Sequence, residues 1–183
     1  MDPPSEVEIR PAADADLTSI LALYRDVGDR HALPLDRAQT IFRRMQSYPD
    51  YIVYVAVSAG EIVGTFALLI MDNLAHLGAP SGVVEDVVVR SDRQGRGIGR
   101  RMMQFARERC RERGCYKMTL SSSLRREAAH RFYETLGFER HGYSFLMELW
   151  DSEGFRRERR GFRFSGRRRF LPALAGDVTQ PST

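Results

Sequence analysis

Residues 83–101 have the sequence VVEDVVVRSDRQGRGIGRR, and this stretch decides the fold. Five of its first seven residues are valine, a density typical of a strand buried on both faces at the centre of a sheet. Three glycines at alternate positions then lead into an amphipathic helix. A strand, a glycine turn and a helix start, in this order, present unpaired backbone N–H groups to a ligand. The stretch therefore predicts a site for a phosphate or pyrophosphate.

The spacing of the glycines excludes two common nucleotide-binding motifs. A dinucleotide fold uses Gly-x-Gly-x-x-Gly, and Arg100 occupies the position of its third glycine. A P-loop needs a lysine before Ser or Thr, whereas the only lysine of the chain is Lys117. The pattern that does fit is Gln-x-x-Gly-x-Gly, which begins at Gln94.

Hydrophobic periodicity predicts the other elements of the chain. They are strands at 7–10, 51–57, 62–71, 83–89, 116–120 and 143–149, and helices at 17–24, 36–45, 97–113 and 128–136. The turn at 58–61 joins two strands as a hairpin, which implies antiparallel pairing in the first half of the chain. Strands alternate with helices in the second half, which implies parallel pairing there. The expected fold class is an α/β (α+β) protein with a mixed sheet covered by helices.

Length and charge predict one domain and a basic tail. The chain has 183 residues, enough for a single core. Residues 1–150 hold 20 basic and 20 acidic side chains, so the net charge of +4 comes from eight arginines and four acids in residues 151–183. We expect a folded domain at 6–150 and a disordered arginine-rich tail at 151–183. Its arginines and phenylalanines could contact nucleic acid, but a solvated tail is the preferred interpretation.

The sequence argues against a membrane-spanning, a secreted, a disulfide-rich and a metal-binding protein. No apolar run is long enough for a membrane span, the acidic start does not match a signal peptide, and two cysteines are too few for a disulfide framework. A cytoplasmic location is therefore expected. No cluster of His, Cys, Asp or Glu has metal-ligand spacing, so no metal is expected.

Four ordered motifs resemble the GNAT superfamily of acetyl-CoA-dependent N-acetyltransferases. They are Glu85-Asp86-Val87-Val88-Val89, Arg-x-Gly-x-Gly-Ile-Gly-Arg at 93–100, Cys115-Tyr116-Lys117-Met118-Thr119-Leu120, and Ala129-His130-Arg131-Phe132-Tyr133 with Leu136-Gly137-Phe138. The resemblance implies a mostly antiparallel sheet whose central strands splay apart around acetyl-CoA. It places the pantetheine arm on the backbone of Val87, Val88 and Val89. It assigns the cofactor phosphates to Gln94, Gly95, Arg96, Gly97, Ile98, Gly99 and Arg100.

The same resemblance implies the catalytic residues. An amine must lose a proton before it attacks a thioester, and the leaving thiolate needs a proton donor. Tyr133 is the expected acid and Glu85 the expected base, with Asp86 or a water chain as alternatives. Neighbouring residues of a strand point to opposite faces, so only one of the two acids is expected to face the cleft. The chain departs from the family at Ser121, where some relatives have an acid, and at Arg126, where an asparagine is common.

The expected activity is direct transfer of an acetyl group from acetyl-CoA to a primary amine of a small molecule. Neither cysteine occupies a recognisable nucleophile position, which favours direct attack over an acetyl-enzyme. Two alternatives stay open: a non-catalytic acyl-CoA sensor, and an acetyltransferase acting on peptide or protein amines. A homodimer is compatible with the resemblance, and the sequence does not identify the acceptor.

Overall fold

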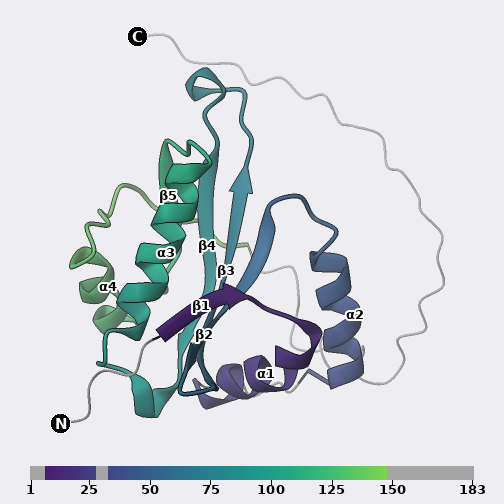
Figure 1. Cartoon of the computed structure of the whole chain (residues 1–183). Coiled ribbons are helices and arrows are strands. Elements are labelled where there is room, and N and C mark those ends of the chain that lie inside the picture. Colours follow the sequence, from purple (N-terminus) through teal and green to yellow (C-terminus); the bar gives the residue numbers. More distant parts are fainter. Residues whose placement is uncertain (1–6, 28–32, 148–183) are drawn as a thin grey trace, which may run out of the picture. The chain divides into compact units, whose positions relative to one another are not determined.

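The strand predicted at 83–89 is β4 (Ser81–Val89), and it lies inside a five-stranded sheet of order β1-β2-β3-β4-β5 (Figure 1). The sheet belongs to a computed structural model that describes residues 7–27 and 33–147. The other strands are β1 (Val7–Pro11), β2 (Tyr51–Ser58), β3 (Glu61–Met71) and β5 (Lys117–Leu120). Neighbouring strands pair antiparallel from β1 to β4, whereas β4 and β5 are parallel. The predicted mixed, mostly antiparallel sheet is confirmed.

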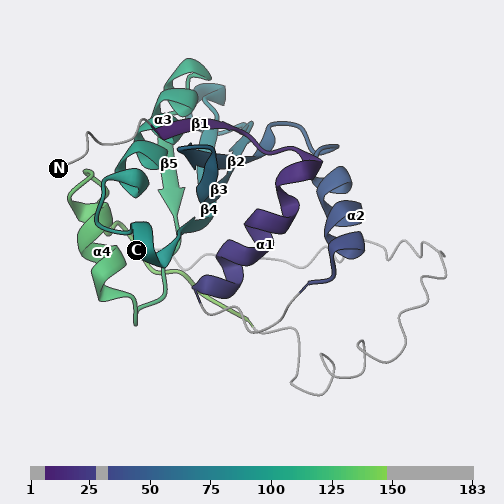
Figure 2. The same cartoon turned by 60° about the horizontal axis from the view of Figure 1, so that its bottom comes forward.

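Helices cover both faces of the sheet (Figure 2). They are α1 (Leu17–Asp26), α2 (Leu35–Met45), α3 (Ile98–Glu112) and α4 (Glu127–Glu134), with short 3-10 turns at Asp14–Asp16, His76–Gly78 and Ser91–Arg93. Alternate residues of β2 show how the faces are divided. Tyr54 and Ala56 belong to the core shared with α3, and Val55 belongs to the core shared with α1 and α2.

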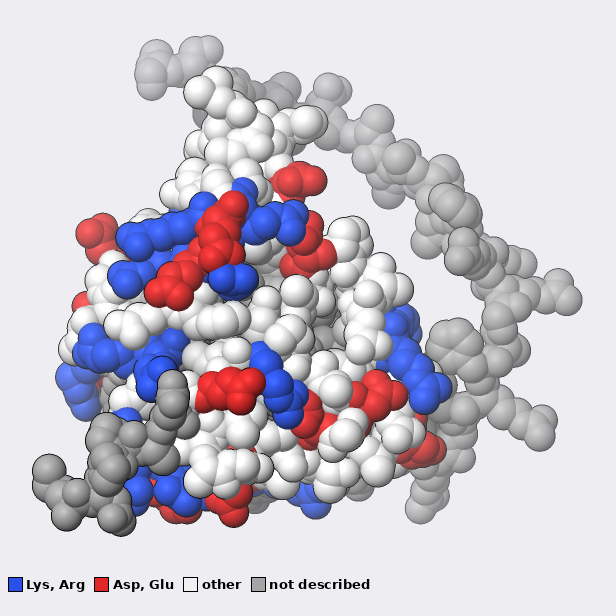
Figure 3. All heavy atoms as spheres, in the orientation of Figure 1, with Lys and Arg blue, Asp and Glu red and all other residues white. Residues whose placement is uncertain are grey.

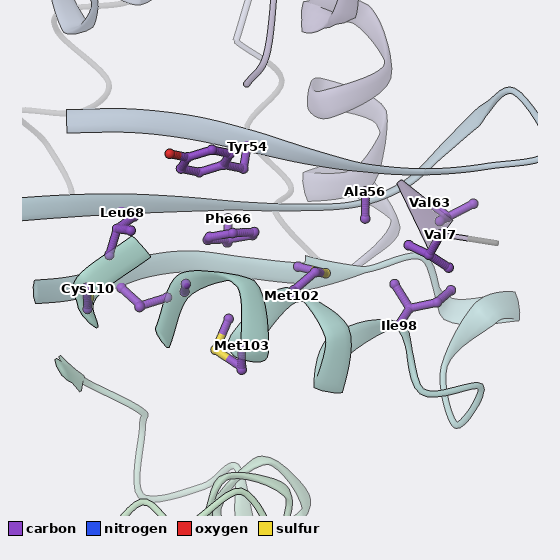
Figure 4. Close-up of a cluster of buried hydrophobic side chains, with 12 residues drawn as sticks. Val7, Tyr54, Ala56, Val63, Phe66, Leu68, Ile98, Met102, Met103 and Cys110 are labelled. Atoms are coloured by element: carbon purple, nitrogen blue, oxygen red, sulfur yellow. The ribbon is translucent and has the colours of Figure 1, made fainter. Parts of the chain in front are cut away.

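The larger core lies between the sheet and α3 (Figure 4). Tyr54 stacks on Phe66 with ring centroids 5.2 Å apart, and Phe105 of α3 meets both rings edge-on. Met102 of α3 is fully buried in the same cluster. Burying aromatic and aliphatic side chains of this size contributes about 1.5–3 kcal/mol each, so this core holds α3 firmly against β3 and β4.

Gly82 lets α3 approach β4 closely. A Cβ added at this glycine would overlap the Sγ of buried Cys110. We therefore expect Gly82→Ala to lower the free energy of unfolding by about 1–3 kcal/mol, the usual cost of overpacking. Urea unfolding measures this loss, and Gly142→Ala is the control because a Cβ there meets nothing within 4 Å. The double variant Gly82→Ala/Cys110→Ala should recover most of the loss; no recovery would contradict this contact as its cause.

The sheet opens where the pairing of β4 with β5 ends. The parallel register runs from Ser81 opposite Lys117 to Val84 opposite Leu120, and no further. From Glu85 onward β4 pairs only with β3. The predicted splaying of the central strands is thus a consequence of a short β5 beside a long β4.

The last predicted strand is wrong over the part of it that is described. The compact unit ends at Gly142, and residues 143–147 belong to a second unit in which they adopt no regular secondary structure. Side-chain alternation specifies the two faces of a strand but not a hydrogen-bonded neighbour, and a strand needs both. The end of that segment, the predicted boundary at 150 and the arginine-rich tail lie outside the described residues.

Charges are intermixed on the surface of the described domain. Figure 3 shows basic and acidic side chains next to one another on the face that carries α3. Ion pairs join some of them, including Arg109 to Glu112 and Arg113 to Asp50. No helix within residues 7–27 and 33–147 is long and apolar enough to span a bilayer.

Candidate active site

A bulge in β4 forms the centre of the site. Thr65 of β3 pairs with Val88 and Ala67 pairs with Glu85, so Asp86 and Val87 together lie opposite the single residue Phe66. Asp86 adopts a left-handed conformation with φ of 52°. A bulge of this kind redirects side chains and adds local twist.

The bulge corrects one prediction about the acids. Glu85 and Asp86 are consecutive, and a regular strand would point them to opposite faces. In the structure both are exposed, and both line the same cavity. The left-handed residue breaks the two-residue alternation, so the cleft receives two carboxylates instead of one.

The cavity lies at the opening of the sheet. Its volume is about 430 Å³, which is in the range of small-molecule sites. It brings together the predicted Glu85, Val87, Val88 and Tyr133. The other lining residues come from α1 and its C-cap, from β4, from the end of β5 and the segment after it, and from α4 and its N-cap: Tyr24, Val27, Val84, Asp86, Leu120, Ser121, Ser122, Arg126 and Ala129.

The predicted glycine loop connects β4 to α3 outside the lining of this cavity. Gly97 is the N-cap of α3 with φ of 81°, a left-handed conformation that glycine adopts without strain. The first N–H of the helix with a backbone acceptor is that of Arg101, which donates to the Gly97 carbonyl at 3.1 Å. Among the described residues, the N–H groups from Gly95 to Arg100 have no acceptor. A helix start in this state favours an anion.

The residues around these amides have different roles in the structure. Ile98 is buried in the core, so only its backbone is available to a ligand. A Cβ on Gly99 would lie 3.1 Å from the ring of Phe132, so this glycine allows α3 and α4 to pack together. The side chain of Gln94 donates a hydrogen bond to the Val89 carbonyl at 3.0 Å and thereby closes the end of β4.

A contact that the sequence does not reveal ties α1 to this loop. The carboxylate of Asp26 accepts hydrogen bonds from the backbone N–H of Ser91 at 2.7 Å and from its hydroxyl at 3.0 Å. The two residues are 65 positions apart, and no local pattern predicts their contact. Because Tyr24 and Val27 line the cavity on either side of Asp26, the contact holds this wall of the site next to the turn before the glycine loop.

Tyr133 lies on the α4 side of the cavity. Its ring packs against Phe132 and Phe138, with centroids 5.1 and 5.6 Å away. Burial raises the pKa of the Tyr133 hydroxyl, and the positive charge of Arg126 opposes that rise. The hydroxyl therefore stays protonated at neutral pH and can act as a proton donor.

Asp86 acts electrostatically on two tyrosines, Tyr24 of α1 and Tyr51 of β2. Although the side chain of Asp86 is exposed by its accessible surface, the surrounding cavity walls partly desolvate its carboxyl, and this desolvation raises its pKa. Burial also raises the pKa of Tyr24 and, less strongly, that of Tyr51, and the charge of Asp86 adds to both shifts. Asp86 and these two phenols therefore form one electrostatic group, which the sequence alone did not connect.

Other kinds of reactive group are not assembled in the described part of the chain. Burial, together with neighbouring Cys115, raises the pKa of Cys110 to about 12, so its thiol stays protonated and is a poor nucleophile. No group of three His, Cys, Asp or Glu side chains that could hold a metal occurs within residues 7–27 and 33–147. The polar groups that face the cavity are carboxylates, hydroxyls and one guanidinium, which suit proton transfer.

An opened mixed sheet with a proton donor, two carboxylates and a free helix start defines an acyl-transfer type of site. The profile of the acetyltransferase (GNAT) family matches residues 17–138. Glucosamine 6-phosphate N-acetyltransferase of Trypanosoma brucei brucei is 31% identical over 145 residues, which are 79% of this chain and 97% of that protein. L-methionine sulfoximine/L-methionine sulfone acetyltransferase of Pseudomonas aeruginosa is 35% identical over 140 residues, 72% of this chain and 79% of that protein.

Solved structures agree with the sequence comparisons. The crystal structure of an acetyltransferase from Trypanosoma brucei covers 79% of this chain and 100% of its own, with a TM-score of 0.70 and 30% identity. The chain belongs to the GNAT acetyltransferase family.

Proposed function

We propose that this protein transfers the acetyl group of acetyl-CoA to a primary amine of a small molecule by direct attack. The observation that carries the proposal is the cavity, whose lining combines two carboxylates of β4 with a protonated tyrosine of α4 where the pairing of β4 with β5 has ended. The two relatives described above act, by their names, on an amino sugar phosphate and on amino acid derivatives. Both kinds of compound are small amines.

The chain's own residues fit acetyl-CoA. The free N–H groups from Gly95 to Arg100 suit its pyrophosphate, and a Cβ on Gly97 would meet nothing within 4 Å, so a ligand can approach the backbone there. Arg96 and Arg100 are exposed beside these amides and add positive charge. Among the described residues, β4 has no paired strand on the β5 side beyond Val84, and there only the Val89 carbonyl is engaged, by the side chain of Gln94. The open edge at Val87 and Val88 suits the pantetheine arm.

Two side chains supply the proton transfers of the proposed reaction, one carboxylate and one tyrosine. Acetyl-CoA supplies an acetyl group as a thioester and departs as a thiol. Glu85 or Asp86 accepts a proton from the ammonium of the acceptor, and the resulting neutral amine is the nucleophile. Tyr133 donates its hydroxyl proton to the departing sulfur.

A panel of amines tests the proposal. The full chain is incubated with acetyl-CoA and glucosamine 6-phosphate, glucosamine, L-methionine sulfone or a short peptide, and the products are identified by mass spectrometry. We expect at least one small amine to gain a single acetyl group, with thiol release above the amine-free control. Tight binding of CoA with no acetylated product from any amine would instead indicate a sensor, and acetylation of the peptide alone would indicate a peptide acetyltransferase.

A further inference from the structure

Arg126 occupies a position in the cavity that the proposed chemistry has not used. It is the N-cap of α4, and Tyr133 follows it seven residues later. Since an α-helix has 3.6 residues per turn, residues seven apart lie on the same face. Arg126 and Tyr133 both line the cavity, together with Ala129 between them.

The charge of Arg126 is not neutralised by a neighbour. Two nearby arginines form ion pairs, Arg131 with Glu127 at 3.7 Å and Arg140 with Glu134 at 2.8 Å. Within residues 7–27 and 33–147, Arg126 has no ion pair and no side-chain hydrogen bond. Its positive charge is therefore available to groups that face the cavity.

The positive charge of Arg126 matters for Tyr133 because of the other charged and titratable groups that line the cavity. Among the residues that the structure describes, the other ionisable groups that line the cavity are Glu85 and Asp86 on β4 and Tyr24 on α1, and none of these is positive. When Tyr133 gives up its proton, the phenolate forms in a half-buried position, at a cavity whose lining also includes the carboxylates of Glu85 and Asp86. Without a nearby cation this negative charge is unfavourable.

We propose that Arg126 is a positioning residue that stabilises the negative charge formed at Tyr133 during acyl transfer. The inference rests on the proposed function.

As the amine nitrogen forms its C–N bond, the C–S bond breaks and its electron pair stays on sulfur. Sulfur takes the Tyr133 proton, and the phenolate regains a proton from the former amine nitrogen. The other proton of the original ammonium has already passed to the carboxylate and then to solvent. Arg126 stabilises the phenolate between these two transfers.

Kinetics of three variants test the proposal. Arg126→Gln removes the charge, Arg126→Lys keeps it, and Arg125→Gln is the control, because Arg125 is an exposed neighbour that does not line the cavity. We expect Arg126→Gln to lower kcat by about 10- to 100-fold, within the range for lost electrostatic and acid catalysis. The KM for acetyl-CoA should stay within about twofold of the wild type, and Arg126→Lys should recover most of kcat.

The pH dependence separates this role from a structural one. The positive charge lowers the pKa of Tyr133, so its removal should move the alkaline limb of the kcat profile to higher pH. An equal change in kcat at every pH would contradict the proposal. A Tyr133→Phe background gives a second check, since Arg126→Gln should then have little further effect. A full effect in that background, or weaker CoA binding with unchanged kcat, would assign Arg126 to another role.

A titration without turnover distinguishes failure of this inference from failure of the proposed function. Tyrosine labelled with ¹³C at Cζ is followed by NMR against pH, and Tyr133 is identified by the signal missing from Tyr133→Phe. Arg126→Gln should move this titration to higher pH, and Arg125→Gln should not. If the titration of Tyr133 is at the same pH in Arg126→Gln as in the wild type, the inference is wrong, even if an amine is acetylated. If the titration shifts but no amine is acetylated, the effect of Arg126 on Tyr133 is supported and the proposed activity is rejected.

Discussion

Replacing Tyr133 by Phe is expected to lower kcat by about 10²- to 10³-fold while leaving the affinity for CoA nearly unchanged. The change removes only the hydroxyl, and the ring keeps its packing against Phe132 and Phe138. Because burial raises the pKa of Tyr133, the wild-type hydroxyl is protonated at neutral pH and available as a donor. Steady-state kinetics with the accepted amine measure kcat, and calorimetry with CoA measures binding.

Tyr48→Phe is the matched control for that experiment. Tyr48 is 49% exposed and does not line the cavity, so the loss of its hydroxyl should leave kcat within about twofold of the wild type. Thermal unfolding of both variants checks that the fold is intact. A Tyr133→Phe protein with normal kcat, or one that loses CoA affinity as much as kcat, would show that the hydroxyl is not the acid.

Much of the fold can be predicted from the sequence because hydrophobic periodicity is a local property. The valine run of β4 and the apolar stripe of α3 each lie within one contiguous segment, so each element is recognisable alone. The hairpin of β2 and β3 follows from its short turn. The parallel pairing of β4 and β5 follows from the helix between them.

The structural features that sequence analysis missed depend on contacts between distant segments. The bulge at Asp86 arises from the register of β4 against β3, and no residue type in the run of valines indicates it. The contact of Asp26 with Ser91 joins residues 65 positions apart. Segment 143–147 shows the opposite error, because its side-chain pattern favours a strand but it pairs with no strand within residues 7–27 and 33–147.

The glycine motif predicts the position of the turn before α3 but not the separate role of each glycine in it. The three glycines at 95, 97 and 99 look equivalent in sequence, and the family resemblance assigns all three to the phosphates. In the structure Gly97 has the left-handed conformation of an N-cap, whereas Gly99 allows the ring of Phe132 to approach α3. A sequence pattern shows where a glycine lies, but it does not show whether the backbone conformation or a neighbouring side chain requires that glycine.

Asp86→Asn is expected to lower kcat by about 10²- to 10³-fold, more than Glu85→Gln does. Both carboxylates line the cavity, but burial raises the pKa of Asp86 and brings it nearer to the working pH of a general base. Asparagine tolerates the left-handed backbone at this position, so the bulge is preserved.

With Asp86 as base, kcat of the wild type should fall as pH drops through a value above the usual aspartate pKa of about 4. Asp86→Asn should lose this acid limb, and Glu85→Gln should retain it.

Asp86→Asn should lower kcat without lowering the stability of the fold. An aspartate whose pKa is higher in the folded than in the unfolded state binds more protons when folded, so stability falls as pH rises from about 4 through the folded pKa. Asp86→Asn removes this cost, and thermal unfolding at neutral pH should show it to be at least as stable as the wild type. A less stable Asp86→Asn protein would mean that its lower kcat reflects a damaged fold. A larger loss of kcat in Glu85→Gln, with the acid limb abolished there, would identify Glu85 as the base and return to the prediction made from the family resemblance.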